Sequence, residues 1–127
     1  MQPTRETLRA IVALLPALED AAPGSLATYN GGAGLDLGEP LARLVELAYQ
    51  GVILDDFDWP RWQDDARAIL GNPAALAQVD MLTLRKLLTL LVRADRFASG
   101  TLADAARDGS LPAILRRLDA LTKDMVI

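Results

Sequence analysis

Glycine and proline divide this sequence into short amphipathic segments, and the positions of these residues favour a helical fold. Proline lies near the start of several segments and glycine just past the end of others, which is the order that helices prefer. The glycines that end segments are Gly51, Gly71, Gly100 and Gly109. Between the breaks, apolar residues recur at helical spacing, and no stretch sustains the period-two alternation of a sheet.

The first helix and the loop after it can be delimited from single residues. Thr4 can cap a helix, and Pro16 should kink or end it, because the proline ring removes one hydrogen bond and crowds the preceding turn. Residues 22–38 contain a Pro-Gly pair and further glycines. We therefore expect a loop there, with a short extended piece around Leu26–Tyr29.

The next two helices have recognisable starts. Pro40 opens a helix that Gly51 closes. Asp58 is well placed as the N-cap of the following helix, and counting from it puts Phe57 and Trp62 at the two positions that pack together as a hydrophobic staple.

The C-terminal half repeats these signals. Asp80 should cap a helix that runs from about residue 81 to residue 98. Thr101 with Asp104 three residues later is typical of a capping box, and Ser110 should cap the last helix. The buried stripe of that last helix is formed by Leu111, Ile114, Leu115, Leu118 and Leu121.

These segments predict one all-α domain over residues 1–127: a compact bundle of about six helices, with short glycine-terminated turns and one longer loop at 22–38. The chain has 127 residues, of which 51% are hydrophobic and 24% charged. That length suits a single core, and that composition argues against disorder.

The sequence contains no cysteine and no histidine, which removes whole classes of chemistry. A disulfide framework, a thiolate nucleophile and a zinc–thiolate site all need cysteine. The usual general base near neutral pH, which is also the commonest metal ligand, is histidine. We predict no catalytic residue, cofactor site or metal site, and the balance favours a protein that is not an enzyme.

The net charge and the hydropathy of the chain limit the classes of partner that we expect. The net charge of −4 disfavours non-specific phosphate binding, so nucleic acid is not the expected partner. The longest uncharged apolar runs, at 10–18 and 87–92, are shorter than the roughly 20 residues that a membrane span needs. We expect a cytoplasmic protein that binds a protein partner, and the sequence leaves homo-oligomerisation open.

Four blocks of residues resemble a known bacterial family. They are Phe57-Asp58-Trp59 with Trp62, Leu84-Arg85-Lys86-Leu87-Leu88-Thr89, Val92-Arg93 with Asp95-Arg96-Phe97 and Gly100, and Ile114-Leu115-Arg116-Arg117-Leu118. Together they are similar to the domain of unknown function numbered six-five-zero-eight. The resemblance implies a stand-alone bacterial protein of similar length, and it implies no activity.

A basic stripe and an acidic cluster are the most prominent charged features. At 100° per residue, the stripe falls within about 80° of arc on one helix face. It consists of Arg85, Thr89, Arg93 and Arg96, and the cluster consists of Asp55, Asp56, Asp58, Asp64 and Asp65. Pairing between the two is the favoured interpretation, and an anion-binding groove along the arginines is the alternative.

Asp95 projects among leucines on the opposite arc of the same helix. A carboxylate on an apolar face must be paired or hydrogen-bonded. Arg116, Arg117, the indole of Trp59 or a backbone N–H could supply the partner. A structural clip that fixes helix register is favoured over a catalytic role, because no second titratable partner can be named.

Two further patterns have a structural and a functional interpretation. The segment around Gly109 partly matches a helix-turn-helix with Arg116 and Arg117 on the recognition helix, but Pro112 intrudes, and an ordinary helical hairpin is favoured. The aromatic residues Phe57, Trp59, Trp62 and Phe97 fit core packing better than an exposed partner-binding anchor.

The leading hypothesis is therefore a non-enzymatic interaction or regulatory module. It would present the Arg85/Arg93/Arg96 face, or the segment 55–65, to a protein partner. One alternative is nucleic-acid binding through the last helix. Another is a small anionic-ligand binder, or an enzyme, that uses Asp95 and the three arginines.

Overall fold

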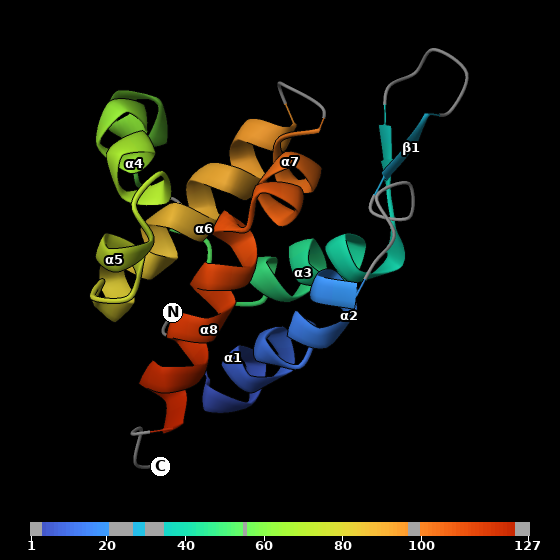
Figure 1. The fold of residues 1–127 in the computed structure, drawn as a ribbon, viewed down its shortest axis with the longest axis horizontal. Coiled ribbons are helices and arrows are strands. Elements are labelled where there is room, and N and C mark those ends of the chain that lie inside the picture. The colour runs from blue at the N-terminus through green and yellow to red at the C-terminus, as the bar shows by residue number, and fades with distance from the viewer. Residues whose placement is uncertain (1–3, 21–26, 30–34, 55, 97–99, 124–127) are drawn as a thin grey trace.

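The helices of the chain pack around a central C-terminal helix (Figure 1). The computed structural model describes residues 4–20, 27–29, 35–54, 56–96 and 100–123. The central helix, α8, contacts α1, α2, α5, α6 and α7. In chain order the elements are α1 (Arg5–Val12), α2 (Leu15–Asp20), β1 (Ala27–Tyr29), β2 (Leu35–Leu37), α3 (Glu39–Tyr49), the 3-10 helix η2 (Trp59–Trp62), α4 (Gln63–Leu70), α5 (Pro73–Leu76), α6 (Met81–Asp95), α7 (Thr101–Asp108) and α8 (Ser110–Lys123).

The expected break at Pro16 divides the first predicted helix into two. Thr4 caps α1, and its hydroxyl accepts a hydrogen bond from the backbone N–H of Thr7 at 3.1 Å. Helix α1 ends at Val12, the residue whose carbonyl the proline ring would crowd. Helix α2 then begins at Leu15, so that Pro16 lies in a first turn, where its missing N–H is harmless.

The predicted loop at 22–38 contains a two-stranded antiparallel hairpin. Strand β1 pairs with β2 in the register Ala27↔Leu37, Thr28↔Asp36 and Tyr29↔Leu35. The hairpin extends away from the helices and joins α3 (Figure 1). The extended piece expected around Leu26–Tyr29 is thus confirmed over Ala27–Tyr29, and Leu26 lies outside the described residues. Its partner strand was not predicted, because three residues are too few to show a period. The all-α fold class is confirmed, with this hairpin as a small addition.

The start of the third predicted helix differs from the expectation in one respect. Asp58 precedes η2, but its side chain makes no capping hydrogen bond. Pro60 occupies the second helical position and has no N–H, which removes one of the two donors that a capping side chain can use. The staple contact is present, because the rings of Phe57 and Trp62 lie 5.5 Å apart in an edge-on arrangement at 67°.

The junction between α6 and α7 corrects two expectations. Asp80 caps α6 as predicted, accepting from the backbone N–H of Thr83 at 2.8 Å, but α6 ends at Asp95 and not near residue 98. The capping box at Thr101 is wrong, because Thr101 is already the first residue of α7 and Gly100, at φ 102°, holds the cap position. Asp95 supplies the missing acceptor instead.

The start of α8 carries a similar correction. Ser110 is the first residue of α8 and not its cap. Its N–H and its hydroxyl both donate to the Asp108 carboxylate, at 2.8 and 2.7 Å. Gly109, at φ 93°, makes the left-handed turn between the helices, as its position predicted.

The core is a cluster of aliphatic side chains contributed by helices along the whole chain. Four of the five positions predicted as the buried stripe of α8 are fully buried, and Leu121 is partly buried. Among the largest fully buried side chains are Leu8, Ile11, Leu41, Leu44, Leu84, Leu87, Leu88, Leu111, Ile114 and Leu115. Burial of this stripe holds α8 at the centre of the bundle.

Candidate functional site

The predicted basic stripe of α6 is split into a buried part, Arg85 and Thr89, and a more accessible part, Arg93 and Arg96. Arg85 is only 8% exposed, and it donates from Nε to the carbonyl of Val52 at 3.1 Å and from Nη2 to the carbonyl of Gly51 at 3.0 Å. Burial lowers the pKa of Arg85 from its ordinary value. Thr89 is fully buried and accepts from the N–H of Leu54 at 3.1 Å. This part of the stripe holds the segment 51–54 in place.

Arg93 and Arg96 lie at the C-terminal end of α6, next to Tyr49. The guanidinium carbon of Arg93 is 5.7 Å from the centre of the Tyr49 ring. Arg96 donates from Nη1 to the Tyr49 hydroxyl at 3.5 Å, and Tyr49 is 45% exposed. A cation over an aromatic face is an attractive arrangement, so the ring and the two guanidinium groups are mutually oriented.

Two hollows adjoin at Arg96. One, of about 340 Å³, is lined by Val45, Tyr49, Val92, Asp95 and Arg96. The other, of about 560 Å³, is lined by Trp59, Pro60, Arg93 and Arg96. We call the surface formed by Tyr49, Trp59, Arg93 and Arg96 the Tyr49–Arg96 face. It combines the two arginines at the C-terminal end of the stripe, of which Arg93 is half-buried and Arg96 exposed, with two aromatic side chains from other elements.

The predicted pairing between the stripe and the acidic cluster is wrong for Arg85, whose donors go to carbonyl groups. Two of the acidic residues pair with arginines of their own segment: Asp58 lies 3.9 Å from Arg61, and Asp64 lies 3.8 Å from Arg67. Both pairs are exposed, and such pairs contribute little to stability. Asp55 lies outside the described residues.

Asp95 acts as a link between two helices. Its side chain is half-buried and accepts a hydrogen bond from the backbone N–H of Leu102 at 3.1 Å. A backbone N–H was one of the partner types considered from the sequence. Because Leu102 lies in the first turn of α7, the carboxylate of one helix caps the next.

Arg116 and Arg117 are both attached to other parts of the molecule. Arg116 forms an ion pair with Glu19 of α2 at 2.9 Å, and Arg117 donates from Nε to the carbonyl of Val79 at 2.8 Å. Along α8 only Arg116, Ala120 and Lys123 are exposed. A recognition helix must offer a full face to a DNA groove, whereas α8 is enclosed by other helices. This geometry disfavours the helix-turn-helix alternative.

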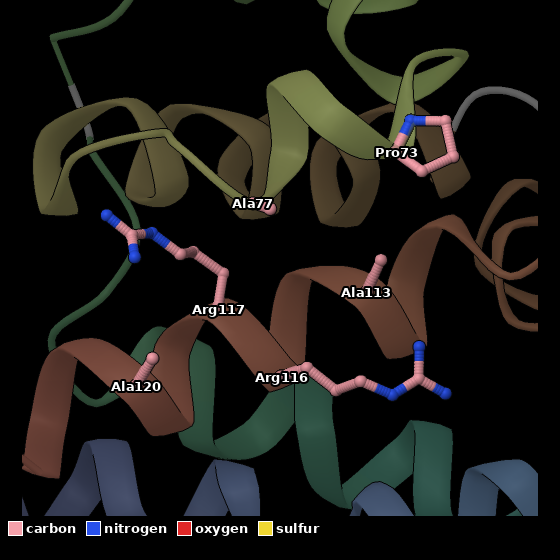
Figure 2. Close-up of a pocket in the computed structure, with 6 residues that line it drawn as sticks. All are labelled: Pro73, Ala77, Ala113, Arg116, Arg117 and Ala120. Carbon is pink, nitrogen blue, oxygen red and sulfur yellow. The ribbon is translucent and has the colours of Figure 1, made fainter.

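A groove runs between α5 and α8 (Figure 2). Its volume is about 310 Å³, and it is lined by Pro73, Ala77, Ala113, Arg116, Arg117 and Ala120. Four of these side chains are small and apolar, and the two arginines lie on α8. The helical signals of the sequence did not reveal this groove, because it depends on how closely α5 approaches α8.

The predicted aromatic motif packs largely against the core. Trp59 and Trp62 are partly buried against it, and Phe97 lies outside the described residues. Sequence reasoning missed the role of Lys86, whose ammonium group lies 5.6 Å from the Phe57 ring centre and 5.8 Å from that of Trp62. It also missed Tyr49, for which the only signal was an aromatic residue outside the apolar stripe of its helix.

No group of three or more acidic side chains within the described ranges is placed to hold a metal ion. In the same ranges, no helix is both long enough and apolar enough to cross a bilayer. A family model described as "Family of unknown function (DUF6508)" matches residues 3–124. No curated protein and no solved structure matches the chain.

Proposed function

Because this chain belongs to the DUF6508 family, whose function is unknown, we propose a role from its geometry: a non-enzymatic module that binds a protein partner through the Tyr49–Arg96 face. The membership agrees with the resemblance seen in the four sequence blocks. The bacterial origin and the cytoplasmic location stay predictions from the sequence.

The observation that carries the proposal is the composition and geometry of this face. Tyrosine, tryptophan and arginine are the residues most enriched at the energetic centres of protein interfaces. Here Tyr49 is 45% exposed, and Arg96 donates to it over a long 3.5 Å contact and forms no ion pair with the described residues. A guanidinium without a carboxylate partner is available to a partner's carboxylate.

The two hollows beside Arg96 support the same role. Each could take an apolar side chain of a partner while Arg96 binds an acidic group between them. The stacking of Arg93 on Tyr49 holds part of the face in one arrangement before binding, which lowers the entropy cost of association. The partner that fits is a surface with an acidic group flanked by apolar side chains.

Two features support a binding role over catalysis. The chain has neither histidine nor cysteine, so the common nucleophile–base pairs cannot form. Asp95, which lines one hollow together with Arg96, accepts from the Leu102 N–H and serves the α6–α7 junction. The enzyme alternative therefore lacks an assigned acid or base.

A quantitative pull-down tests the proposal. The tagged protein, its Tyr49→Ala and Arg96→Glu variants, and an Arg67→Glu control are incubated with lysate of the host cells, and captured proteins are compared by mass spectrometry. Arg67 is a suitable control because its side chain is 77% exposed, lies on α4 and lines neither of the two hollows beside Arg96. We expect a partner that is captured by the unchanged protein and the control and lost with both face variants.

Circular dichroism and melting curves of all four proteins establish that the variants are folded. A partner captured equally well by the Tyr49→Ala and Arg96→Glu variants would exclude this face as its binding site. So would a partner lost with Arg67→Glu alone.

A further inference from the structure

The groove between α5 and α8 is separate from the Tyr49–Arg96 face, and we propose that it binds a free aliphatic carboxylate (Figure 2). The proposal rests on three observations: an apolar wall on both helices, a guanidinium at the groove whose orientation is already fixed, and a volume suited to a small molecule.

The walls of the groove suit an aliphatic chain. Pro73 and Ala77 lie on the α5 side and face Ala113 and Ala120 of α8 in Figure 2. Ala113 and Ala120 are seven residues apart and so lie on the same face of the helix. Because all four side chains are small, the helices leave about 310 Å³ open between them, which is at the lower end for small-molecule sites.

Arg117 provides the partner for a carboxylate. Its Nε donates to the Val79 carbonyl at 2.8 Å, which fixes the plane of the guanidinium. The two Nη atoms form no hydrogen bond or ion pair with the described residues. These two nitrogens form the forked donor pair that binds both oxygens of a carboxylate. The group is thus oriented, charged and available for a ligand.

Arg116 lines the groove but is not the residue that we expect to bind the carboxylate. Its Nη2 is 2.9 Å from the Glu19 carboxylate, so its charge is already matched. Figure 2 shows the two arginines leaving α8 in different directions, with Arg117 directed towards the segment after α5. A ligand would place its carboxylate at Arg117 and its chain over the alanines and Pro73.

This arrangement requires both parts of the ligand. A short carboxylate such as acetate would leave the apolar wall uncovered, and a neutral alcohol of the same length would leave the guanidinium without a charged partner. Octanoate, which has both, is the probe, with acetate and 1-octanol as matched comparisons.

The test is a titration of the ¹⁵N-labelled protein with octanoate below its micelle concentration, followed by NMR. We expect saturable shifts of the amide signals of Ala77, Ala113 and Ala120. Arg117→Gln should weaken binding at least about tenfold, since a hydrogen bond to a charged group contributes more than 1.4 kcal/mol. Ala120→Trp should abolish binding by filling the groove.

The controls distinguish this site from general surface binding. Arg107→Gln removes an exposed arginine of α7 that pairs with Asp104 and should leave octanoate binding unchanged. Ala77→Leu is a second blocking variant at an exposed position, used with the amide spectrum as evidence of folding.

Four results would overturn the proposal: shifts that do not saturate, octanol binding as well as octanoate, an unchanged affinity in Arg117→Gln, or octanoate shifts confined to residues around Tyr49. The pull-down is judged separately, because the two sites share no lining residue and its variants leave the α5–α8 groove unchanged.

Discussion

Arg85 places a guanidinium where water has almost no access and gives it two backbone carbonyls as partners. Replacing it with methionine would keep much of the packing volume but leave the Val52 and Gly51 carbonyls without their donors. We expect Arg85→Met to lower the free energy of unfolding by about 2–4 kcal/mol, measured by chemical denaturation.

The matched control is Arg61→Ala, because the Arg61 side chain is 88% exposed and lies 3.9 Å from Asp58. Its effect should stay within about 0.5 kcal/mol. Equal effects of the two substitutions would contradict a structural role for Arg85.

Asp119 makes the stability depend on pH. Its hydrogen bond with Arg9, followed by that with Lys123, lowers the pKa of this carboxyl below its ordinary value of 3.8. A lowered pKa in the folded state means that the stabilisation is complete above the ordinary value and is lost as the pH falls below it through the lowered pKa.

Asp119→Asn tests this dependence in melting curves recorded from neutral to acid pH. We expect the variant to melt at a lower temperature than the unchanged protein near pH 7. The difference should shrink as the pH falls from the ordinary pKa through the lowered one, because Asp119 is protonated first in the unfolded chain and then in the folded protein. A constant difference across the whole range would rule out the charge of Asp119 as its source.

At the scale of the element, α7 is capped from a distance by Asp95 of α6. Asp95→Ala removes the acceptor of the Leu102 N–H and should lower the free energy of unfolding by about 1 kcal/mol. Hydrogen exchange of the Leu102 amide should also become faster. Asp95→Asn keeps an oxygen acceptor and should cost less.

Asp104→Ala is the decisive comparison, because it removes the second residue of the capping box expected from the sequence. Among the described residues, the Asp104 side chain pairs with Arg107 alone, at 3.5 Å on the surface, so its loss should lower the free energy of unfolding by less than about 0.5 kcal/mol. A larger loss of unfolding free energy in Asp104→Ala than in Asp95→Ala would support the capping box and contradict capping by Asp95.

The turn between α7 and α8 depends on the conformation of Gly109. At φ 93° this residue lies in the left-handed region, while an added Cβ would have no atom within 4 Å. Gly109→Ala should therefore lower the free energy of unfolding by about 1–2 kcal/mol, measured by chemical denaturation, through backbone strain alone. Gly109→Asn should cost less, because asparagine tolerates this region; an equal cost for both would point to another cause.

At the scale of the whole molecule, α8 joins helices from both ends of the chain. Leu115, fully buried in its stripe, should be among the most sensitive positions: Leu115→Ala should lower the free energy of unfolding by about 2–5 kcal/mol. Leu82→Ala is the control, since Leu82 is 52% exposed, and should change it by no more than about 0.5 kcal/mol. Similar losses would show that α8 is not the centre of the core.

The distribution of charge over the surface is also a property of the whole molecule. The chain carries a net charge of −4, yet the Tyr49–Arg96 face and the α5–α8 groove each expose arginine. Both proposed sites therefore offer positive charge to an acidic group on a molecule whose net charge is negative. This contrast is a property of the folded molecule and is not visible in the net charge.

The roles of residues that interact only with their close neighbours along the chain could be predicted from the sequence. Thr4 and Asp80 cap their helices, Pro16 separates α1 from α2, and Gly109 ends α7. Each depends on the geometry of one turn, for which residue type and spacing are sufficient information. The buried stripe of α8 was predictable for the same reason, since helical periodicity shows which positions share a face.

Tertiary structure alone decided which distant groups meet. Asp95 caps α7 in place of Thr101, Arg85 bonds to carbonyls in place of carboxylates, and Tyr49 joins Arg93 and Arg96. The physical reason is that a helical pattern specifies which face is buried but not which element covers it. Contacts between elements, and the groove between α5 and α8, follow from how the helices pack around α8.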